Sequence, residues 1–279
     1  MSGGPVRRRR WPVNVAGAVA FAVFAFPVYW MVLTSFRRER DVRTVDVDVL
    51  PSVLTLDNYR AVFERDFFTD ALRTSLIVTV LTVTGALFLA FLAAVALARF
   101  RFGGRKAFII AVLVIQMVPA EAMVISLFRV LDGWDLVNSI AGLTLTYLAF
   151  VLPFTIWTLR GFVSGVPHDL EEAAMVDGSS RLRAFFTVTL PLIAPGLVAT
   201  GIFAFIQAWN EFLYALVIMN RPENQTLPVW LQAFNEGARG TNWGGVMAGS
   251  TLITVPVLVF FLLVHRRVTS GLTAGAVKG

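Results

Sequence analysis

The chain has 279 residues, of which 57% are hydrophobic and 15% are charged, and its mean hydropathy is +0.72. This composition excludes an ordinary soluble globular protein and predicts an all-α protein that crosses a membrane several times. The formal net charge of +6 does not indicate a nucleic-acid partner, because the basic residues gather at the ends of apolar runs, where they favour membrane lipid headgroups. The absence of cysteine excludes a disulfide framework and thiolate metal ligation.

Six apolar runs are each long enough to cross a bilayer as a helix. The N-terminal segment 1–10 contains four consecutive arginines, which favour a cytoplasmic N-terminus, and an even number of spans returns the C-terminus to the same side. The first run is longer than the apolar part of a typical signal peptide, so we expect it to be retained. The predicted spans are residues 11–36, 74–98, 107–128, 136–159, 192–219 and 240–264, with Glu121 interrupting the third and Glu211 the fifth.

The segments between the spans complete the predicted organisation. Residues 37–73 form an extracytoplasmic (periplasmic) loop, residues 74–264 form a core of five spans with a cytoplasmic loop at 160–191, and residues 265–279 form a cytoplasmic tail. Most basic residues fall in the predicted cytoplasmic segments, as expected. One group of basic residues is an exception, because Arg37, Arg38, Arg40 and Arg43 directly follow the first span, in the predicted extracytoplasmic loop. The acidic residues of that loop lower its net positive charge but do not account for the arginines.

The sequence lacks the motifs of an enzyme. It contains no phosphate-binding GxxxxGK[ST] loop, and the nearest approach, from Gly103 to Lys106, lacks the first glycine and the hydroxyl. The two histidines, His168 and His265, lie at predicted span ends, and no acidic or histidine cluster has metal-ligand spacing. We therefore predict a non-catalytic chain without a metal or bound cofactor, so any ATP must be hydrolysed by another subunit.

A polar passage between Pro167 and Pro191 interrupts this apolar chain. Pro167 and a group of acidic residues are typical of a helix start, and Gly178 provides a left-handed stop. Ser179 or Ser180 can then cap a second short helix, which Pro191 ends or kinks. The pattern predicts a helical elbow that fits a groove on a partner, although an ordinary loop packed against its own bundle is an equal alternative.

Residues 172–174, together with Gly178, Val188, Leu190 and Pro191, resemble the EAA signature of the membrane subunit of binding-protein-dependent ATP-binding-cassette importers. Val188 replaces the usual isoleucine of the signature and keeps an aliphatic side chain. The resemblance implies a type I importer permease fold with six transmembrane helices, in which the elbow is a cytoplasmic coupling helix that docks on the ATPase. The residues that it assigns to this contact are Glu172, Ala173, Ala174, Asp177, Gly178, Leu190 and Pro191.

Further matches along nearly the whole chain are similar to the carbohydrate-uptake, maltose-type branch. They are the segments 57–60, 74–76, 209–212 and 271–279. The resemblance implies a bacterial inner-membrane location, a sugar or oligosaccharide solute and an extracytoplasmic solute-binding protein. It also implies a second homologous permease, expected to be a different chain, and a cytoplasmic ATPase dimer that holds ATP and Mg. Gly275, Lys278 and Gly279 of the tail would contact this dimer, unless the tail is merely a frayed terminus.

Carboxylates at membrane depth are costly and tend to face a cavity or a partner. Around Glu211, hydrogen-bonding groups and aromatic rings alternate, a mixture that suits a polyhydroxylated solute. The cluster could instead pack against the partner permease or lie at the outer membrane interface. The candidate substrate-pathway residues are Gln207, Trp209, Asn210, Glu211, Tyr214 and Glu121.

Three other functions compete with a sugar importer subunit. An importer subunit for a non-sugar small solute would share the elbow and differ in the tail. A self-sufficient secondary carrier would need coupling-ion ligands and often repeats of its spans, for which the sequence offers little support. A non-transporting scaffold would leave the elbow unexplained.

Overall fold

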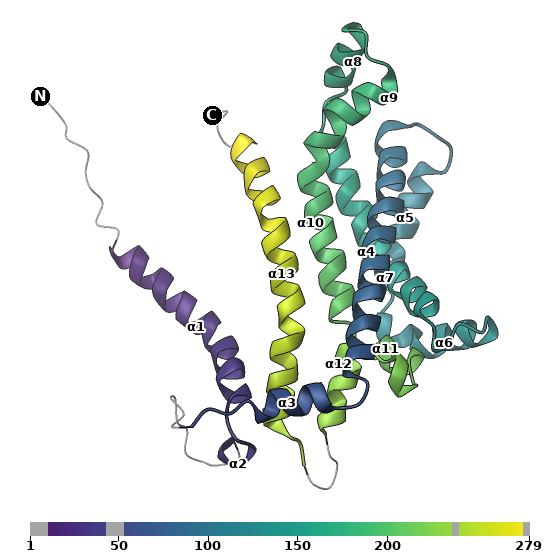
Figure 1. The fold of residues 1–279 in the computed structure, drawn as a ribbon. Helices are drawn as coiled ribbons and strands as arrows, with labels where there is room; N and C mark the ends of the chain where they lie inside the picture. Colours follow the sequence, from purple (N-terminus) through teal and green to yellow (C-terminus); the bar gives the residue numbers. More distant parts are fainter. Residues whose placement is uncertain (1–10, 43–52, 236–239, 276–279) are drawn as a thin grey trace, which may run out of the picture. The chain divides into compact units, whose positions relative to one another are not determined.

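The computed structural model describes residues 11–42, 53–235 and 240–275, so the predicted N-terminal segment 1–10 and the last four residues of the tail lie outside the described residues. Five of its helices are long and apolar enough to cross a membrane, and a sixth span is present if one sharply bent pair of helices is counted (Figure 1). The chain is a nearly all-helical membrane protein, as predicted. Its residues divide into two units.

The first unit contains the described residues up to Arg65 together with Ala233–Val255. It holds α1 (Trp11–Ser35), α2 (Glu39–Val42), α3 (Asp57–Glu64) and the start of α13 (Trp243–Gly275). The predicted loop 37–73 is therefore partly helical. It is also shorter than predicted, because the second span begins at Phe68 rather than at residue 74.

The second unit is built on three long helices, α4 (Phe68–Arg99), α7 (Ile140–Ser164) and α10 (Leu190–Trp209). The buried face of α4 carries Ala86, Ala90 and Ala94, spaced four residues apart and fully buried against α7 and α10. Small side chains at this spacing let helix backbones approach closely, which is how helices associate in a membrane.

Some of the hydroxyl groups on the packed faces bond within their own helices. The Thr155 hydroxyl donates to the Val151 carbonyl at 2.8 Å, and the Thr200 hydroxyl donates to the Gly196 carbonyl at 2.8 Å. A polar group inside a bilayer has no water to bond, so this return to the preceding turn satisfies it without a partner helix.

The third predicted span, 107–128, is wrong as a continuous helix. The structure has α5 (Arg105–Ile115), a short 3₁₀ turn (Ala120–Met123) and α6 (Val124–Gly133), with a 92° bend between the two arms. The break falls at Pro119, which lacks a backbone N–H and forces the preceding residue out of helical conformation.

The fifth predicted span, 192–219, also differs. Its main helix α10 ends at Trp209, and α11 (Leu213–Ile218) follows after a break that contains Glu211. The short helix α12 (Leu227–Trp230) comes next.

At its other end, α10 continues without interruption from α9 (Arg181–Ala184) through one π-helical turn (Phe185–Thr189). Pro191 therefore does not end the elbow's second helix. The widened turn before it accommodates the carbonyl that the proline cannot bond.

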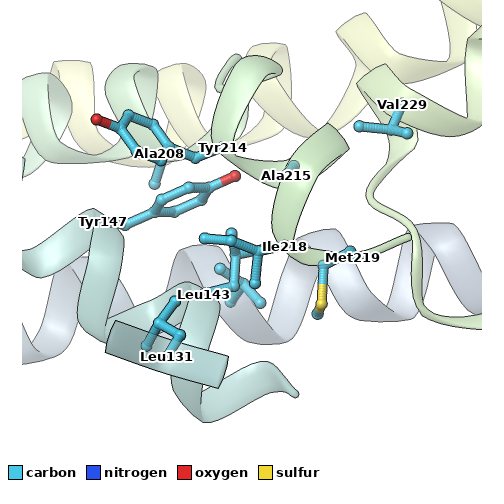
Figure 2. Close-up of a cluster of buried hydrophobic side chains, with 10 residues drawn as sticks. Leu131, Leu143, Tyr147, Ala208, Tyr214, Ala215, Ile218, Met219 and Val229 are labelled. Atoms are coloured by element: carbon cyan, nitrogen blue, oxygen red, sulfur yellow. The ribbon is translucent and has the colours of Figure 1, made fainter. Parts of the chain in front are cut away.

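A hydrophobic cluster fills one end of the second unit, where α4, α6, α7, α10 and α11 meet (Figure 2). Tyr147 of α7 and Tyr214 of α11 lie within it, and the Tyr214 ring packs on Phe150 with ring centroids 4.7 Å apart. The two tyrosines bring polar hydroxyls to the edge of an apolar core.

The close approach of α10 and α7 yields a stability prediction. A Cβ added to Gly196 would lie 2.4 Å from Cγ of Phe162, whereas one added to Gly161 would meet nothing within 4 Å. We expect Gly196→Ala to lower the stability of the folded protein by about 1–3 kcal/mol, because it overpacks the helix contact. Gly161→Ala is the control and should be neutral or stabilising, since alanine favours a helix. Thermal unfolding of the detergent-purified variants measures both, and equal midpoints would contradict the packing.

Candidate functional site

The polar passage folds as the predicted elbow. Its first helix, α8 (His168–Val176), starts directly after Pro167, and Gly178 follows with a φ of +90°. The Ser180 hydroxyl accepts a hydrogen bond from the backbone N–H of Arg183 at 3.3 Å and caps α9. A short first helix, a left-handed glycine and a capped start of the second helix are therefore confirmed, whereas the second helix is not short, because it continues into α10.

The outer surface of the elbow is left uncovered by the described part of the chain. Within α8, which is described in full, no residue is buried, and the Val176 side chain is 88% exposed. The exposed set includes four of the predicted contact residues, Glu172, Ala173, Asp177 and Gly178, while Ala174 is half-buried. An exposed apolar side chain among charges, on a segment with almost no core of its own, is typical of a surface that docks on another protein.

The remaining two predicted contact residues lie elsewhere. Leu190 is half-buried and packs against a cluster that includes Val163 and Ile193. Pro191 is exposed, but it belongs to the first turn of α10. The structure thus separates the seven predicted residues into five on the elbow and two at the base of the span that follows it.

A buried polar network joins the elbow to the spans. Arg99, the last residue of α4, places Nη2 3.0 Å from Oε1 of Glu171 on α8, and their side chains are 8% and 12% exposed. The Thr189 hydroxyl, at the end of the π-helical turn, donates to the same carboxylate oxygen. Nη1 of Arg99 also donates to the Val166 carbonyl at 3.1 Å, just before the elbow begins.

This network ties α8 to the end of α4 and to the base of α10 at once. The sequence does not predict this network, because an acid such as Glu171 near Pro167 indicates only a helix start, and a base such as Arg99 at a span end indicates only the cytoplasmic side. Thr189, a polar residue with apolar neighbours just before the span, is a sign that a polar partner lies nearby. The sequence does not show that this partner is Glu171, which is far away in the chain.

A second group of predicted residues meets at a cavity. The cavity has a volume of about 200 Å³ and lies in the second unit between α7, α10 and α11, beside the 3₁₀ turn that precedes α6. Four of the six candidate pathway residues line it, and other residues contribute aromatic rings and aliphatic side chains. The lining includes Glu121, Gln207, Glu211, Tyr214, Tyr147, Phe150 and Val151.

Hydrogen bonds fix the Glu211 carboxylate in this wall. It accepts the Tyr147 hydroxyl at 2.8 Å and the backbone N–H groups of Tyr214 and Ala215 at 2.8 and 3.0 Å. The Tyr214 hydroxyl donates to the Ala120 carbonyl. Glu211 thus satisfies the free amides at the start of α11, which explains why an acid stands at this break.

The other two pathway candidates lie outside the cavity lining. Trp209 is 2% exposed and stacks on Phe205 with ring centroids 5.7 Å apart, so it belongs to the core. Asn210 is exposed and donates to the carbonyl of Ile206 one turn earlier. Within the described ranges 11–42, 53–235 and 240–275, no group of three or more acidic or histidine side chains could hold a metal ion.

Several membrane-spanning helices, a projecting helical elbow and a polar cavity among the spans define a membrane transport subunit. The comparison with family models makes the class specific: residues 86–273 match the family described as "Binding-protein-dependent transport system inner membrane component". The chain belongs to this family, the membrane permease subunits of ATP-binding-cassette importers. The secondary-carrier alternative is therefore wrong.

Relatives match over nearly their whole length. The diacetylchitobiose uptake system permease protein DasC of Streptomyces coelicolor is 46% identical over 97% of this chain and 98% of its own. The trehalose transport system permease protein SugB of Mycobacterium tuberculosis is 38% identical over 99% and 100%. A chain of a bacterial transporter that imports the polysaccharide alginate has the same fold, with a TM-score of 0.77, 21% identity and coverage of 95% and 99%.

The buried pair at the base of the elbow gives the second prediction. Glu171→Gln leaves the Arg99 guanidinium buried without its counter-charge, and we expect a loss of about 3–5 kcal/mol in stability. Glu172→Gln removes the same charge from the adjacent exposed position and should change stability by less than about 1 kcal/mol. Thermal unfolding midpoints of the two purified variants are compared. Similar shifts would show that the Arg99–Glu171 pair contributes no more to stability than an exposed charge does.

Proposed function

We propose that this chain is the permease subunit of an ATP-driven importer for a sugar or oligosaccharide. The observation that carries the proposal is the high identity, over the full length, to permease proteins named for diacetylchitobiose and trehalose uptake. A solved relative was captured with a periplasmic protein bound to an alginate pentasaccharide, which supports an extracytoplasmic solute-binding protein as a partner here. An importer of a non-sugar solute is the alternative.

The exposed face of α8 is the contact with a cytoplasmic ATPase dimer, which binds ATP and Mg in place of this chain. Its exposed alanine and valine side chains present a shallow apolar surface, and the flanking acids Glu172 and Asp177 offer charges to basic groups of the partner. The chain itself carries no phosphate-binding loop, so it depends on ATP hydrolysis in the ATPase dimer. Conformational changes of that dimer reach this chain through the elbow.

The Arg99–Glu171–Thr189 network transmits movement of the elbow to the spans. When the ATPase dimer closes, α8 is displaced, and the buried ion pair carries the displacement to the end of α4. The bond from Thr189 passes it to the base of α10. Motion at the cytoplasmic surface thereby reaches the two helices that border the packed core, as alternating access requires.

The cavity around Glu211 forms part of the solute pathway. The carboxylates accept hydrogen bonds from sugar hydroxyls, and the Gln207 amide both accepts and donates them. The rings of Phe150 and Tyr214 offer flat apolar surfaces to sugar faces. With a volume of about 200 Å³ the cavity is too small for an oligosaccharide by itself. The complete pathway is therefore shared with a second permease, which we expect to be a different chain.

The orientation follows from the charges. We place the protein in a bacterial inner membrane with both termini and the elbow in the cytoplasm, because lysines and arginines follow the same ends of several spans. They are Arg99, Arg101, Arg105 and Lys106 after the second span, Arg181 and Arg183 in the elbow, and Arg266 and Arg267 near the end of α13. α13 extends to Gly275, beyond the predicted span end, while Lys278 and Gly279 lie outside the described residues. Contact between this tail and the ATPase remains part of the proposal.

The coupling role is tested at the turn of the elbow. Gly178 has a φ of +90° and no neighbour within 4 Å of an added Cβ, so a substitution is limited by backbone conformation and not by space. Gly178→Val should reduce uptake at least about tenfold, because β-branched residues strongly disfavour this region. Gly178→Asn should retain most activity, because asparagine tolerates a positive φ better than other side chains do.

The measurement is uptake of labelled diacetylchitobiose and trehalose by cells that carry the whole system, beside the ATPase activity of the purified complex. We expect Gly178→Val to assemble and to lose the stimulation of ATPase activity by solute-loaded binding protein. If the valine variant assembles and still transports normally, the elbow does not couple ATP hydrolysis to transport.

The pathway is tested by filling the cavity. Gln207→Trp places a large ring in the space beside Glu211 and should abolish uptake while the complex still assembles. Ile206→Trp adds the same ring to an adjacent exposed position that does not line the cavity and should preserve uptake. Normal uptake by the Gln207→Trp variant would remove the cavity from the pathway.

A further inference from the structure

A separate cavity lies within the first unit. Its volume is about 260 Å³, and it is lined by the last turns of α1, the end of α2 and the first turns of α13. These elements, together with α3, gather at one end of α1 (Figure 1). The lining residues are Trp30, Thr34, Arg37, Val42, Trp243 and Met247.

Two buried polar side chains line the cavity, and polar atoms of both lack a hydrogen-bond partner among the described residues. Arg37 is 6% exposed, and its guanidinium carbon lies 5.0 Å from the centre of the Trp30 ring. Among the residues that the structure describes, no acceptor is within hydrogen-bond distance of its Nε or Nη2. Thr34 is 4% exposed, and its hydroxyl likewise has no partner in the described ranges.

The two described carboxylates that follow Arg37 most closely in the sequence make other contacts. Glu39 accepts the backbone N–H of Gly244 at 2.9 Å, and Asp41 lies 3.5 Å from the side chain of Arg40. A buried guanidinium without a counter-charge costs several kcal/mol. The arrangement therefore has a place for an anion that the described residues do not supply.

The backbone holds Arg37 in this position. The Asn58 side-chain amide donates to the carbonyls of Ser35 and Arg37 at 2.9 and 2.6 Å. Gly244 packs against Asn58, because a Cβ there would lie 2.5 Å from the Asn58 oxygen. Asn58 thus holds the backbone of the turn after α1, and Gly244 packs behind it. These contacts fix the position of Arg37 within the first unit.

We propose that this cavity binds the phosphate group of an anionic phospholipid in the outer leaflet. It stands at the predicted extracytoplasmic end of the first span, where indole rings favour the lipid interface. An arginine fork recognises phosphate oxygens, and the threonine hydroxyl adds a donor. Exposed apolar side chains along α1, such as Phe24 at 80% exposure, offer a surface for the acyl chains.

The lipid site also accounts for an anomaly of the sequence. Arg37 follows the first span on the side where basic residues are unexpected. Bound to a phosphate, it serves as a ligand-binding group and not as a topology signal. The inference does not depend on which solute the transporter carries, so its failure would leave the proposed function untouched.

The test uses the whole transporter, purified with its partner subunits and delipidated. Native mass spectrometry follows retention of phosphatidylglycerol as this lipid is titrated. Phosphatidylcholine, whose choline opposes the guanidinium, is the comparison, and we expect it to be retained less. Arg37→Gln should weaken phosphatidylglycerol binding by on the order of tenfold or more, because it removes a charged hydrogen-bond donor. Arg40→Gln removes the same charge from an exposed neighbouring position and should leave binding unchanged.

Three results would overturn the proposal. Equal lipid retention by Arg37→Gln and the wild type would show that Arg37 is not a lipid ligand. Displacement of the lipid by excess inorganic phosphate, with phosphate binding lost in Arg37→Gln, would assign the site to free phosphate. Loss of a protein subunit from Arg37→Gln with lipid retained would assign it to a protein partner. If Arg37→Gln does not assemble, Thr34→Val decides, because a few-fold weaker lipid binding is expected and unchanged binding overturns the site.

Discussion

The close contact of α4 with α7 and α10 is the constraint on which the second unit depends. In a bilayer the surrounding lipid is as apolar as the helix faces, so burial of apolar surface gives little drive for association, and packing must supply it. The fully buried alanines of α4 and the contact of Gly196 with Phe162 provide that packing. By fixing these helices, they also fix the position of Arg99, where α4 ends.

The position of Arg99 determines how the elbow behaves. A helix as short as α8 has little stability of its own in water, and none of its residues is buried. It is held instead by one carboxylate that meets a guanidinium and a hydroxyl from two different helices. Because the ion pair is nearly buried, either charge alone would be costly, and the elbow and the spans are therefore favoured to move as a single body.

Local chemistry made the elbow predictable from the sequence. Pro167, Gly178 and Ser180 each specify a backbone conformation or a cap without reference to distant residues, and hydropathy located most of the spans. The breaks within the third and fifth spans were harder to predict. A window of apolar residues cannot distinguish a straight span from one that turns at Pro119, or a span that stops at Trp209 from one that continues.

Pairings between distant segments were the least predictable. Four of the six pathway candidates meet at one cavity, but Tyr147, which bonds the Glu211 carboxylate, comes from another helix and carried no local signal. Likewise, Arg37 looked like an exception to a charge rule, and its surroundings became visible only when α13 was placed beside it. Tertiary contacts, rather than helix propensity, determine the roles of these residues.

The π-helical turn between α9 and α10 has a consequence for evolution and engineering of this junction. A turn that holds one extra residue rotates everything before it by about 100° relative to an uninterrupted α-helix. The angular register of the elbow is therefore set independently of the apolar stripe of the span. Chimaeras that exchange the elbow between permeases keep the docking surface aligned when the exchanged segment includes the whole π turn, and lose that alignment when the junction cuts through it.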